Sequence, residues 1–424
     1  MENLLWLCCA GFGYDDASMV KETITRQSHS AETITQICSR YGLSAPSSYK
    51  ALSGGFSGTN YRLDFFDGTN VCLKICHGYL ISFVEAQARV QDFLQKHHYK
   101  TACFAVPLIS SAATDNFQFA TLDPTTGDPA IVLTFSTGRA ADALLEEGRV
   151  SVKTAFDGFG SSLGALHSIP VLPGDNLRTY EEGGACDVYK QMTKSVLHTM
   201  ESSEFTKDHP FVTKFYKSRR DALETTMLKA KSSLLQIGVI HGDPFADNVM
   251  LDPITGQVVA WIDWEDATTG PILFDVAVAI IGTCFPSGSS TIDFERLQCL
   301  MAGYTRVRPL SSDELAMLLD FCRLSLLCNC SWRFVNFHVE HREIVECRNR
   351  YKELEERIYF LELETTENMI MDIFQKVEKS DCYVVPPVKD DNNRLVSSRR
   401  LVLLGAAVFT VGFSVVGKLL MGTK

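Results

Sequence analysis

Three oxygen-bearing side chains lie in and just after the stretch "HGDPFADNVM" at residues 241–250. Asp243 and Asn248 have the spacing D-x-x-x-x-N, and Asp263 follows at the end of the apolar stretch "VVAWID". A lone Asp at a strand end is usually a turn residue. Mg²⁺ prefers hard oxygen ligands and takes only one or two of them from protein. We therefore predict that Asn248 and Asp263 hold Mg²⁺ and that Asp243 accepts a proton from an attacking hydroxyl.

A charged side chain, Lys74, interrupts the stretch "VCLKIC" at residues 71–76. In a strand it would share a face with two cysteines, and a buried charge needs a partner. A nucleotide phosphate or a carboxylate would serve, and Glu85 in the following helical stretch is the candidate. The alternative is an edge-strand lysine that faces solvent.

The stretch "SGGFSGTNY" at residues 53–61 is a Gly-rich turn. Glycine lets backbone amides approach a phosphate closely, and the hydroxyl groups of Ser57 and Thr59 add donors. Taken alone, the pattern also fits an ordinary flexible turn. It indicates a phosphate site only in combination with Lys74 and Asp243.

Two regions of different pattern carry these residues. Residues 49–136 predict a small sheet with one helix: Asp67-Gly68 indicates a two-residue hairpin turn, and residues 82–97 have helical periodicity. Residues 130–138 predict a further buried strand. The rest of the chain is mainly helical, apart from two short strands around "DPITG" at residues 252–256. A β-rich part followed by a helical part predicts an α+β fold with a cleft between two lobes.

Composition narrows the class of protein. The 424 residues carry a net charge of −11, which argues against a general nucleic-acid binder because phosphate backbones require clustered Lys and Arg. The 14 cysteines form no CxxC pair, so we expect reduced thiols in a cytosol-facing protein. The N-terminus lacks the basic region of a signal peptide.

The C-terminal residues 401–421 form an apolar run in which Lys418 is the only charge. A helix of this length covers about 30 Å, enough for a bilayer core. The alternative is a buried core helix. Because the run follows a polar, Pro-containing linker, we expect a membrane anchor, in the mitochondrial outer membrane or the endoplasmic reticulum.

Several motifs in order resemble one superfamily. The Gly-rich hairpin, the strand lysine, "HGDPFADN" and "WIDWED" are similar to the protein-kinase-like small-molecule phosphotransferases, the aminoglycoside phosphotransferase and choline kinase superfamily. "LGALHSIP" (163–170) and "GPILFDVAVAI" (270–280) resemble its helices before and after the catalytic loop. "AGYTRVRPLSSDEL" (302–315) most resembles the kinase-like homoserine kinases. The resemblance covers residues 40–340.

The resemblance implies a bilobal protein-kinase-like fold that binds ATP and Mg²⁺. Asp243 would be the catalytic base, and Asn248 and Asp263 would hold the metal. Lys74 would contact the α- and β-phosphates and pair with Glu85. Further nucleotide-binding residues are implied in the Gly-rich turn, over the phosphates, and in "LTFS", beside the adenine. They are Ser53, Gly54, Gly55, Ser57, Gly58 and Thr59 in the turn, and Leu133 and Phe135 in "LTFS".

The sequence also departs from the kinase pattern. "GGFSG" lacks the usual Gly-x-Gly spacing, Gly242 stands where protein kinases carry Arg, and "IDW" replaces "DFG". These differences argue against protein substrates.

The resemblance implies that Asp275 braces the catalytic loop. We expect His167 and His241 to be buried structural residues and Asp247 to face solvent or brace the loop.

The predicted organisation is an N-terminal extension (1–45), a nucleotide-binding N-lobe (46–136), a helical C-lobe (137–380), a linker (381–400) and a transmembrane anchor (401–421). The predicted function is ATP- and Mg²⁺-dependent phosphotransfer to a small-molecule hydroxyl, with homoserine or a related amino alcohol as the first candidate. Aminoglycosides, choline and amino sugars are alternatives, and so is a catalytically inactive, membrane-tethered binding protein. A carboxylate-bearing acceptor would require an arginine, for which the candidates are Arg139, Arg323 and Arg333.

Overall fold

The structure is a computed structural model that describes residues 29–52, 58–114, 116–172, 174–175, 177–178, 194–232 and 235–379. These residues belong to one compact unit, Met1–Ser380. Three predicted features lie outside the described residues: the first part of the Gly-rich turn (53–57), the linker and the membrane anchor.

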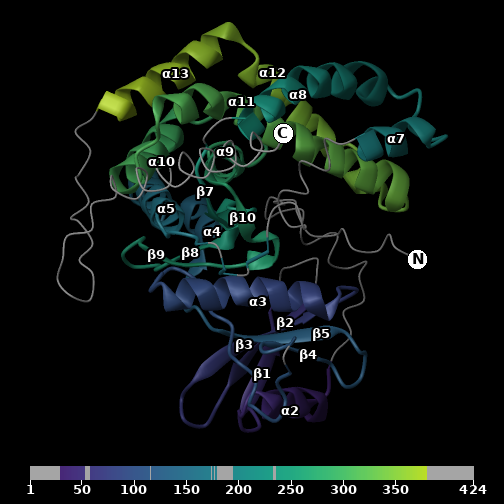
Figure 1. Cartoon of the computed structure of the whole chain (residues 1–424), viewed down its shortest axis with the longest axis vertical. Helices are drawn as coiled ribbons and strands as arrows, with labels where there is room; N and C mark the ends of the chain where they lie inside the picture. Colours follow the sequence, from purple (N-terminus) through teal and green to yellow (C-terminus); the bar gives the residue numbers. More distant parts are fainter. Residues whose placement is uncertain are drawn as a thin grey trace, which may run out of the picture. The chain divides into compact units, whose positions relative to one another are not determined.

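An antiparallel five-stranded sheet forms the N-terminal part, in the order β1-β2-β3-β5-β4. Its strands are β1 (Ser48–Ala51), β2 (Gly58–Asp64), β3 (Asn70–Cys76), β4 (Ala120–Leu122) and β5 (Pro129–Thr134). Helix α3 (Ile81–Lys96) packs on one face of the sheet and α2 (Ala31–Arg40) on the other (Figure 1). The small sheet with one covering helix that the sequence predicts is therefore present.

Helix α2 falls within the predicted N-terminal extension, but it is part of the core of the sheet. Ser30 caps it by accepting a hydrogen bond from the amide of Thr33. Ile34 and Ile37 are fully buried against the sheet residues Leu73 and Ile75. The N-terminal lobe therefore begins well before residue 46.

The hairpin between β2 and β3 has a three-residue loop, so the predicted two-residue turn is wrong. The amide of Phe65 donates to the carbonyl of Thr69 at 2.9 Å, which leaves residues 66–68 as the loop. Gly68 adopts a left-handed backbone (φ 83°), and the Asp67 carboxylate accepts from the Thr69 amide. Three-residue loops that end in a left-handed glycine are a common hairpin solution.

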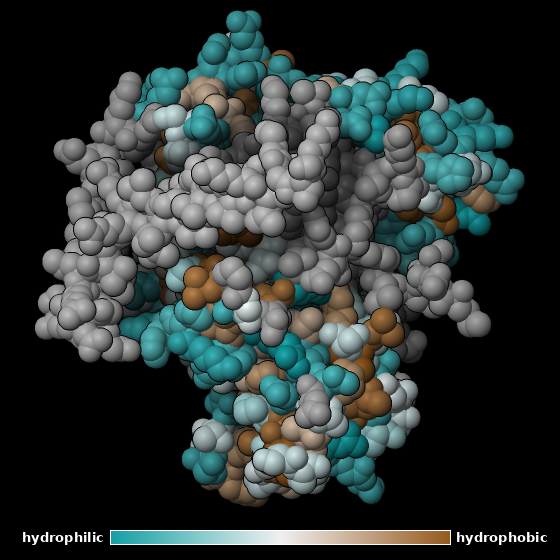
Figure 2. Space-filling view, in the orientation of Figure 1, coloured by the Kyte–Doolittle hydropathy of each residue, from teal (hydrophilic) through white to brown (hydrophobic). Residues whose placement is uncertain are grey.

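The C-terminal part is mainly helical and contains two small sheets. Strand β8 (Val249–Leu251) pairs with β6 (Arg139–Ala140) and β9 (Val258–Trp261), and β7 (Ile237–Ile240) pairs with β10 (Thr268–Pro271). The helices are α4 (Ala141–Glu146), α5 (Val152–His167), α7 (Lys194–Ser202), α8 (Lys217–Ser232), α9 (Ile272–Thr283), α10 (Phe294–Val307), α11 (Ser312–Val335), α12 (Tyr351–Leu361) and α13 (Glu364–Lys379). The outer helices α12 and α13, at the top of the view, present mainly hydrophilic residues (Figures 1 and 2).

Helices α9 and α11 form the centre of this part. All but one residue of α9 is buried, and α11 packs against both α9 and α12. Within the described residues, the helical stretch Ser312–Glu340 is long and apolar enough to cross a membrane, but 72% of its most apolar window is buried inside the protein. It serves as a core helix. The ten cysteines among the described residues are free thiols, eight of them buried.

Candidate active site

The loop after β7 is held by a carboxylate from the first turn of α9. The backbone amides of His241 and Gly242 each donate to Asp275 at 2.8 Å. Asp275 is fully buried, and Gly242 has a left-handed backbone (φ 89°) that favours glycine. The expected brace is therefore present and fixes the backbone just before Asp243.

Asn248 is tied to Asp243 by two hydrogen bonds. Its amide nitrogen donates to the backbone oxygen and to the carboxylate Oδ2 of Asp243, both at 2.9 Å. A short 3-10 helix, Ala246–Asn248, follows Asp243 and leads the chain directly into β8. Because the nitrogen of Asn248 faces Asp243, its amide oxygen is the atom left to act as a metal ligand.

The β8–β9 hairpin brings Asn248, just before β8, and Asp263, just after β9, to the same end of the hairpin. The amide of Ile262 donates to the carbonyl of Asn248 at 2.9 Å, next to the paired Val249 and Trp261. Asp263 adopts a left-handed backbone (φ 61°), which costs a non-glycine residue on the order of 1 kcal/mol. Such strain is typical of a functional position.

The Lys74 ammonium bridges two carboxylates from the segment after β9. It lies 2.7 Å from Asp263 Oδ1 and 2.8 Å from Glu265 Oε2. Burial of Lys74 favours the neutral amine, but the charges of Asp263 and Glu265 dominate and raise the pKa of Lys74 well above its usual value. Lys74 is therefore a buried cation, as expected, and not an edge-strand lysine in solvent.

The predicted pairing of Lys74 with Glu85 is wrong. The Glu85 carboxylate instead accepts hydrogen bonds from three successive backbone amides, residues 118–120, each at 2.9 Å, and lies 3.3 Å from Arg89. These amides lie just before β4 and at its first residue, Ala120. Glu85 is thus a structural acceptor that fixes the start of β4, and Glu265 takes its place beside Lys74.

Carboxylates crowd around Asp243. Burial raises its pKa well above the usual value, and the charges of Asp266, Asp247, Asp263 and Glu265 add to the shift. Four carboxylates thus act on Asp243, and two of them, Asp263 and Glu265, share the single ammonium of Lys74. This surplus of negative charge favours a bound cation.

Asp247 belongs to the same acidic group. It is half-buried, so it does not simply face solvent. Burial raises its pKa to about 7, and the carboxylate of Asp142, on α4, adds to the shift. The pKa of Asp142 is raised as well, again by burial.

The metal-binding prediction is compatible with these side chains. Among the residues that the structure describes, no three His, Cys, Asp or Glu side chains meet as a metal-binding group. An amide oxygen from Asn248 and a carboxylate from Asp263 nevertheless suit Mg²⁺, which usually keeps several waters and takes phosphate oxygens from its substrate. The acidic surroundings are consistent with a divalent cation.

The sequence profile of the phosphotransferase enzyme family matches residues 48–310. The chain belongs to this family. The matched region contains the sheet, the Lys74–Glu265 pair and the whole catalytic loop.

Curated relatives resemble shorter stretches of this phosphotransferase. Homoserine kinase from Neisseria meningitidis is 34% identical over 104 residues, which are 24% of this chain and 33% of the relative. Homoserine kinase from a Caulobacter species is 41% identical over 80 residues, 19% of this chain and 24% of the relative. The chain thus spans a third or less of the length of these relatives.

Solved structures share the fold of the phosphotransferase. A microcompartment-associated aminopropanol kinase aligns with a TM-score of 0.55 at 15% identity, over 80% of this chain and 99% of the other. A spectinomycin phosphotransferase, solved with ADP and spectinomycin, aligns with a TM-score of 0.52 at 16% identity, over 83% of this chain and 99% of the other. Plasmodium vivax ethanolamine kinase aligns with a TM-score of 0.52 at 12% identity, over 85% of this chain and 97% of the other. The fold is therefore the predicted mixed α+β, kinase-like one.

Two predicted phosphate-binding residues have structural explanations. Thr59 is almost fully buried in β2, and its hydroxyl group is bonded to His77 Nε2 at 2.9 Å, so the prediction that Thr59 donates to a phosphate is wrong. A Cβ atom at Gly58 would lie 2.1 Å from the carbonyl oxygen of Ile75. Glycine is therefore required there for β2 and β3 to pair closely.

The residues predicted beside the adenine lie at the end of β5. Leu133 pairs with Cys72 across the sheet and is half-buried. Phe135 follows the strand, and the guanidinium of Arg62 lies 4.9 Å from its ring centroid. Both positions remain predictions for the nucleotide.

The arginines predicted for an acceptor carboxylate already have carboxylate partners. Each forms an ion pair within its own part of the fold: Arg139 with Glu147, Arg323 with Asp320 and Glu367, and Arg333 with Glu353. None of these partners belongs to the acidic group around Asp243.

Sequence reasoning did not identify two residues close to Glu265, the partner of Lys74: Arg178 and Tyr79. Arg178 donates to the backbone carbonyls of Glu265 and Ala267 and stacks over the ring of Phe83. The Tyr79 hydroxyl group is buried and has no hydrogen-bond partner among the described residues. The only sequence signal was "WIDWED" itself, in which Glu265 follows Asp263 by two positions.

Proposed function

We propose that this phosphotransferase transfers the γ-phosphoryl group of ATP to the hydroxyl of a small molecule that carries a cationic amine. The observation that supports this best is the group of carboxylates around Asp243, those of Asp247, Asp263, Glu265 and Asp266. A nearby cation relieves repulsion between carboxylates. An ammonium group on the acceptor would supply that cation next to the hydroxyl to be phosphorylated.

The proposed step is a direct transfer. The acceptor oxygen bonds to the γ-phosphorus, the bond between that phosphorus and the bridging oxygen of ADP breaks, and the hydroxyl proton passes to the Asp243 carboxylate. Asn248 and Asp263 would hold Mg²⁺, which would neutralise phosphate charge when bound. Lys74, fixed between Asp263 and Glu265, would place a second positive charge at the phosphates.

An amino alcohol without a carboxylate fits this site better than homoserine. Homoserine has both an ammonium and a carboxylate, and the three arginines predicted for the carboxylate are paired elsewhere. Homoserine remains the second candidate because the curated sequence relatives are homoserine kinases. The proteins of similar fold include an aminopropanol kinase and an ethanolamine kinase, so the fold accommodates such acceptors.

The test is a phosphotransfer screen of the full chain with ATP and Mg²⁺. The acceptors are 1-amino-2-propanol, ethanolamine, choline, homoserine and an aminoglycoside. Asp243→Ala should lower kcat by about a thousandfold or more while the protein stays folded. Asp208→Asn, at an exposed position away from the loop, is the matched control and should keep full activity. Full activity of the Asp243 variant would refute the assignment.

A non-catalytic binding protein is the second candidate. It is favoured if the wild-type chain binds ATP in a thermal-shift assay but phosphorylates none of the acceptors. The predicted membrane anchor is a separate proposal: the full chain should sediment with membranes, and a chain ending at residue 398 should remain in the supernatant. A full chain found in the supernatant would refute the anchor alone.

A further inference from the structure

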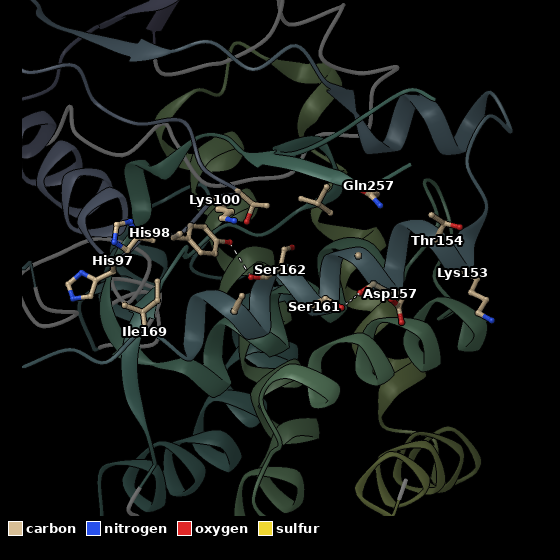
Figure 3. Close-up of a pocket in the computed structure, with 15 residues that line it drawn as sticks. His97, His98, Lys100, Lys153, Thr154, Asp157, Ser161, Ser162, Ile169 and Gln257 are labelled. Carbon is tan, nitrogen blue, oxygen red and sulfur yellow. Dashed lines mark hydrogen bonds between the residues drawn. The ribbon is translucent and has the colours of Figure 1, made fainter. Parts of the chain in front are cut away.

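A pocket of about 980 Å³ lies away from the catalytic loop (Figure 3). Its walls are the segment that follows α3 (residues 97–101), the exposed face of α5, and the start of β9. The lining contains neither Lys74 nor any of Asp243, Asn248 and Asp263. Its volume lies in the range of small-molecule sites, about 300–1,000 Å³.

Basic side chains dominate the charge of this pocket. His97, His98 and Lys100 gather toward one end, and Lys153 stands at the other (Figure 3). Among the described residues, neither lysine has an ion-pair partner. The only carboxylate in the lining belongs to Asp157, and Arg306 already binds both its oxygens at 2.7 and 2.6 Å. The pocket therefore offers uncompensated positive charge, which attracts anions.

The floor of the pocket is apolar. Tyr99 and Ile169 are buried there, beside Ala165 and Val258. The Tyr99 hydroxyl group donates to the carbonyl of Ser162 at 3.1 Å, so this hydroxyl group is already bonded within the protein. An apolar floor beside a basic end suits an anion with an apolar body.

The pocket is linked to the strand that carries the predicted metal ligand. The amide of Trp261 donates to the carbonyl of Thr101 at 2.9 Å, and its indole donates to Ser162 Oγ at 3.0 Å. Thr101 and Ser162 line the pocket, and Trp261 ends β9 two residues before Asp263. The pocket-lining segment 97–101 continues directly from α3, and α3 packs against the 3-10 helix Trp264–Asp266. An occupant would thus contact β9, which borders the phosphotransfer site, and the segment that continues from α3.

We propose that this pocket is a second ligand site, for a small organic anion with an apolar body, and that its occupancy changes nucleotide binding. The anionic group would lie near His98 and Lys100, and the apolar body on Tyr99 and Ile169. The two sites would be coupled through β9 and α3, and such coupling is reciprocal. The binding site does not depend on the acceptor proposed above.

Binding is tested by titration calorimetry of the full chain with three probes whose alkyl chains have seven or eight carbons. Octyl phosphate and octanoate carry an anionic head, and octyltrimethylammonium carries a cationic one. We expect saturable binding of at least one anion and weaker binding of the cation by roughly tenfold or more. A preference between the two anions identifies phosphate or carboxylate as the head group. No saturable anion binding, or equal binding of the cation, would refute the site.

Two variants locate the binding. Lys100→Glu reverses a charge of the pocket, whereas Lys207→Glu makes the same change at an exposed position outside it. Gly158→Leu fills the cavity, because a Cβ atom there would lie 3.3 Å from the Val258 side chain. Lys100→Glu and Gly158→Leu should weaken anion binding roughly tenfold, and Lys207→Glu should not. Unchanged binding in both pocket variants would place the anion elsewhere, and their thermal unfolding shows that they are folded.

Coupling is tested with octanoate, because octyl phosphate would compete at the nucleotide phosphates. Saturating octanoate should change the affinity for ADP by roughly fivefold or more, in either direction. Gly158→Leu should bind ADP like the wild type but without the response to octanoate. An ADP affinity that octanoate leaves unchanged would refute the regulatory role, and a response that persists in Gly158→Leu would also refute it.

Discussion

The ammonium of Lys74 lies 2.8 Å from the carboxylate of Glu265, in the segment after β9. Both side chains are almost fully buried. The lysine of the sheet is therefore tied to the same segment that supplies Asp263, and not to helix α3. The pair couples the position of the predicted phosphate-binding group to that of the predicted metal ligand.

The first prediction separates Glu265 from Glu85. Glu265→Gln removes the charge beside Lys74 and leaves only Asp263 to hold the ammonium, so kcat/KM for ATP should fall roughly ten- to a hundredfold. Glu85→Gln leaves Lys74 untouched but weakens the bonds to the three amides of residues 118–120. It should lower the free energy of unfolding by about 1.5–3 kcal/mol and keep most of the activity.

Steady-state kinetics and urea unfolding of both variants check this prediction. If the Lys74–Glu85 pair formed in the working enzyme, the pattern would reverse. Glu85→Gln would then lose activity, and Glu265→Gln would lose little.

The second prediction concerns the buried hydroxyl group of Tyr79. It has no hydrogen-bond partner among the described residues. Burial raises its pKa, and the charges of Glu265, Asp266 and Asp263 add to the shift. Tyr79→Phe removes a buried polar group without a bond, so the unliganded protein should keep its stability or gain slightly. If a ligand accepts this hydrogen bond, its KM should rise roughly three- to tenfold.

The matched control is Tyr99→Phe, which loses the bond to the carbonyl of Ser162. It should lower the free energy of unfolding by about 1 kcal/mol and leave the KM values for ATP and acceptor unchanged. A Tyr79→Phe enzyme that is destabilised as much as Tyr99→Phe would show that the Tyr79 hydroxyl is bonded in solution.

Local spacing made the catalytic loop predictable from sequence. Asp243, Asn248 and Asp263 lie on one strand–loop–strand unit, so their separation along the chain nearly determines their neighbours in space. The brace from Asp275 entered only through the family resemblance, because it crosses to another helix. The sheet was predictable for a similar local reason, since its strands alternate and its turns carry glycine.

Contacts between distant segments were not predictable in the same way. The Glu85 carboxylate is bonded to the amides of residues 118–120 and Lys74 to Glu265, and sequence spacing shows neither contact. The burial of Thr59 could have been predicted, since Thr59, Tyr61 and Leu63 alternate on one face of β2 and all three are buried. The strand period therefore predicts the position of Thr59 better than the Gly-rich pattern does.

The third prediction concerns the crossing of α5 and α10. A Cβ atom at Gly160 would lie 2.0 Å from the carbonyl oxygen of Leu300 and 2.5 Å from the amide of Tyr304. These backbone atoms cannot move aside without separating the helices. Gly160→Ala should therefore lower the free energy of unfolding by about 1–3 kcal/mol, although alanine favours helix.

Gly158→Ala in the same helix is the control, because its Cβ would lie 3.3 Å from the Val258 side chain and no closer than 4.0 Å to a backbone atom. There the helix preference of alanine, up to about 1 kcal/mol, should leave stability unchanged or raised. Urea unfolding of both variants measures the two changes in the free energy of unfolding. Equal effects of the two substitutions would contradict the close crossing.

The last prediction concerns the pH dependence of stability. His167 is fully buried, with Nε2 3.1 Å from Asp275 and Nδ1 2.8 Å from the Tyr304 hydroxyl group. Burial lowers its pKa below 6.5, and Asp275 offsets only part of that shift. The folded state thus binds fewer protons than the unfolded state below pH 6.5, so His167 stabilises the fold above that pH. This contribution falls as the pH drops toward the folded pKa, by about 1.4 kcal/mol per pH unit at most.

The acidic group shifts stability in the opposite direction. Asp247, whose pKa is raised to about 7, binds a proton more readily in the folded state, which favours folding as the pH falls. The wild-type slope alone therefore does not isolate His167. His167→Gln can still donate to Asp275 but does not titrate, so its free energy of unfolding should fall less than that of the wild type between pH 7 and 5.5. Parallel urea-unfolding curves of the two proteins across this range would show that His167 does not bind its proton differently in the two states.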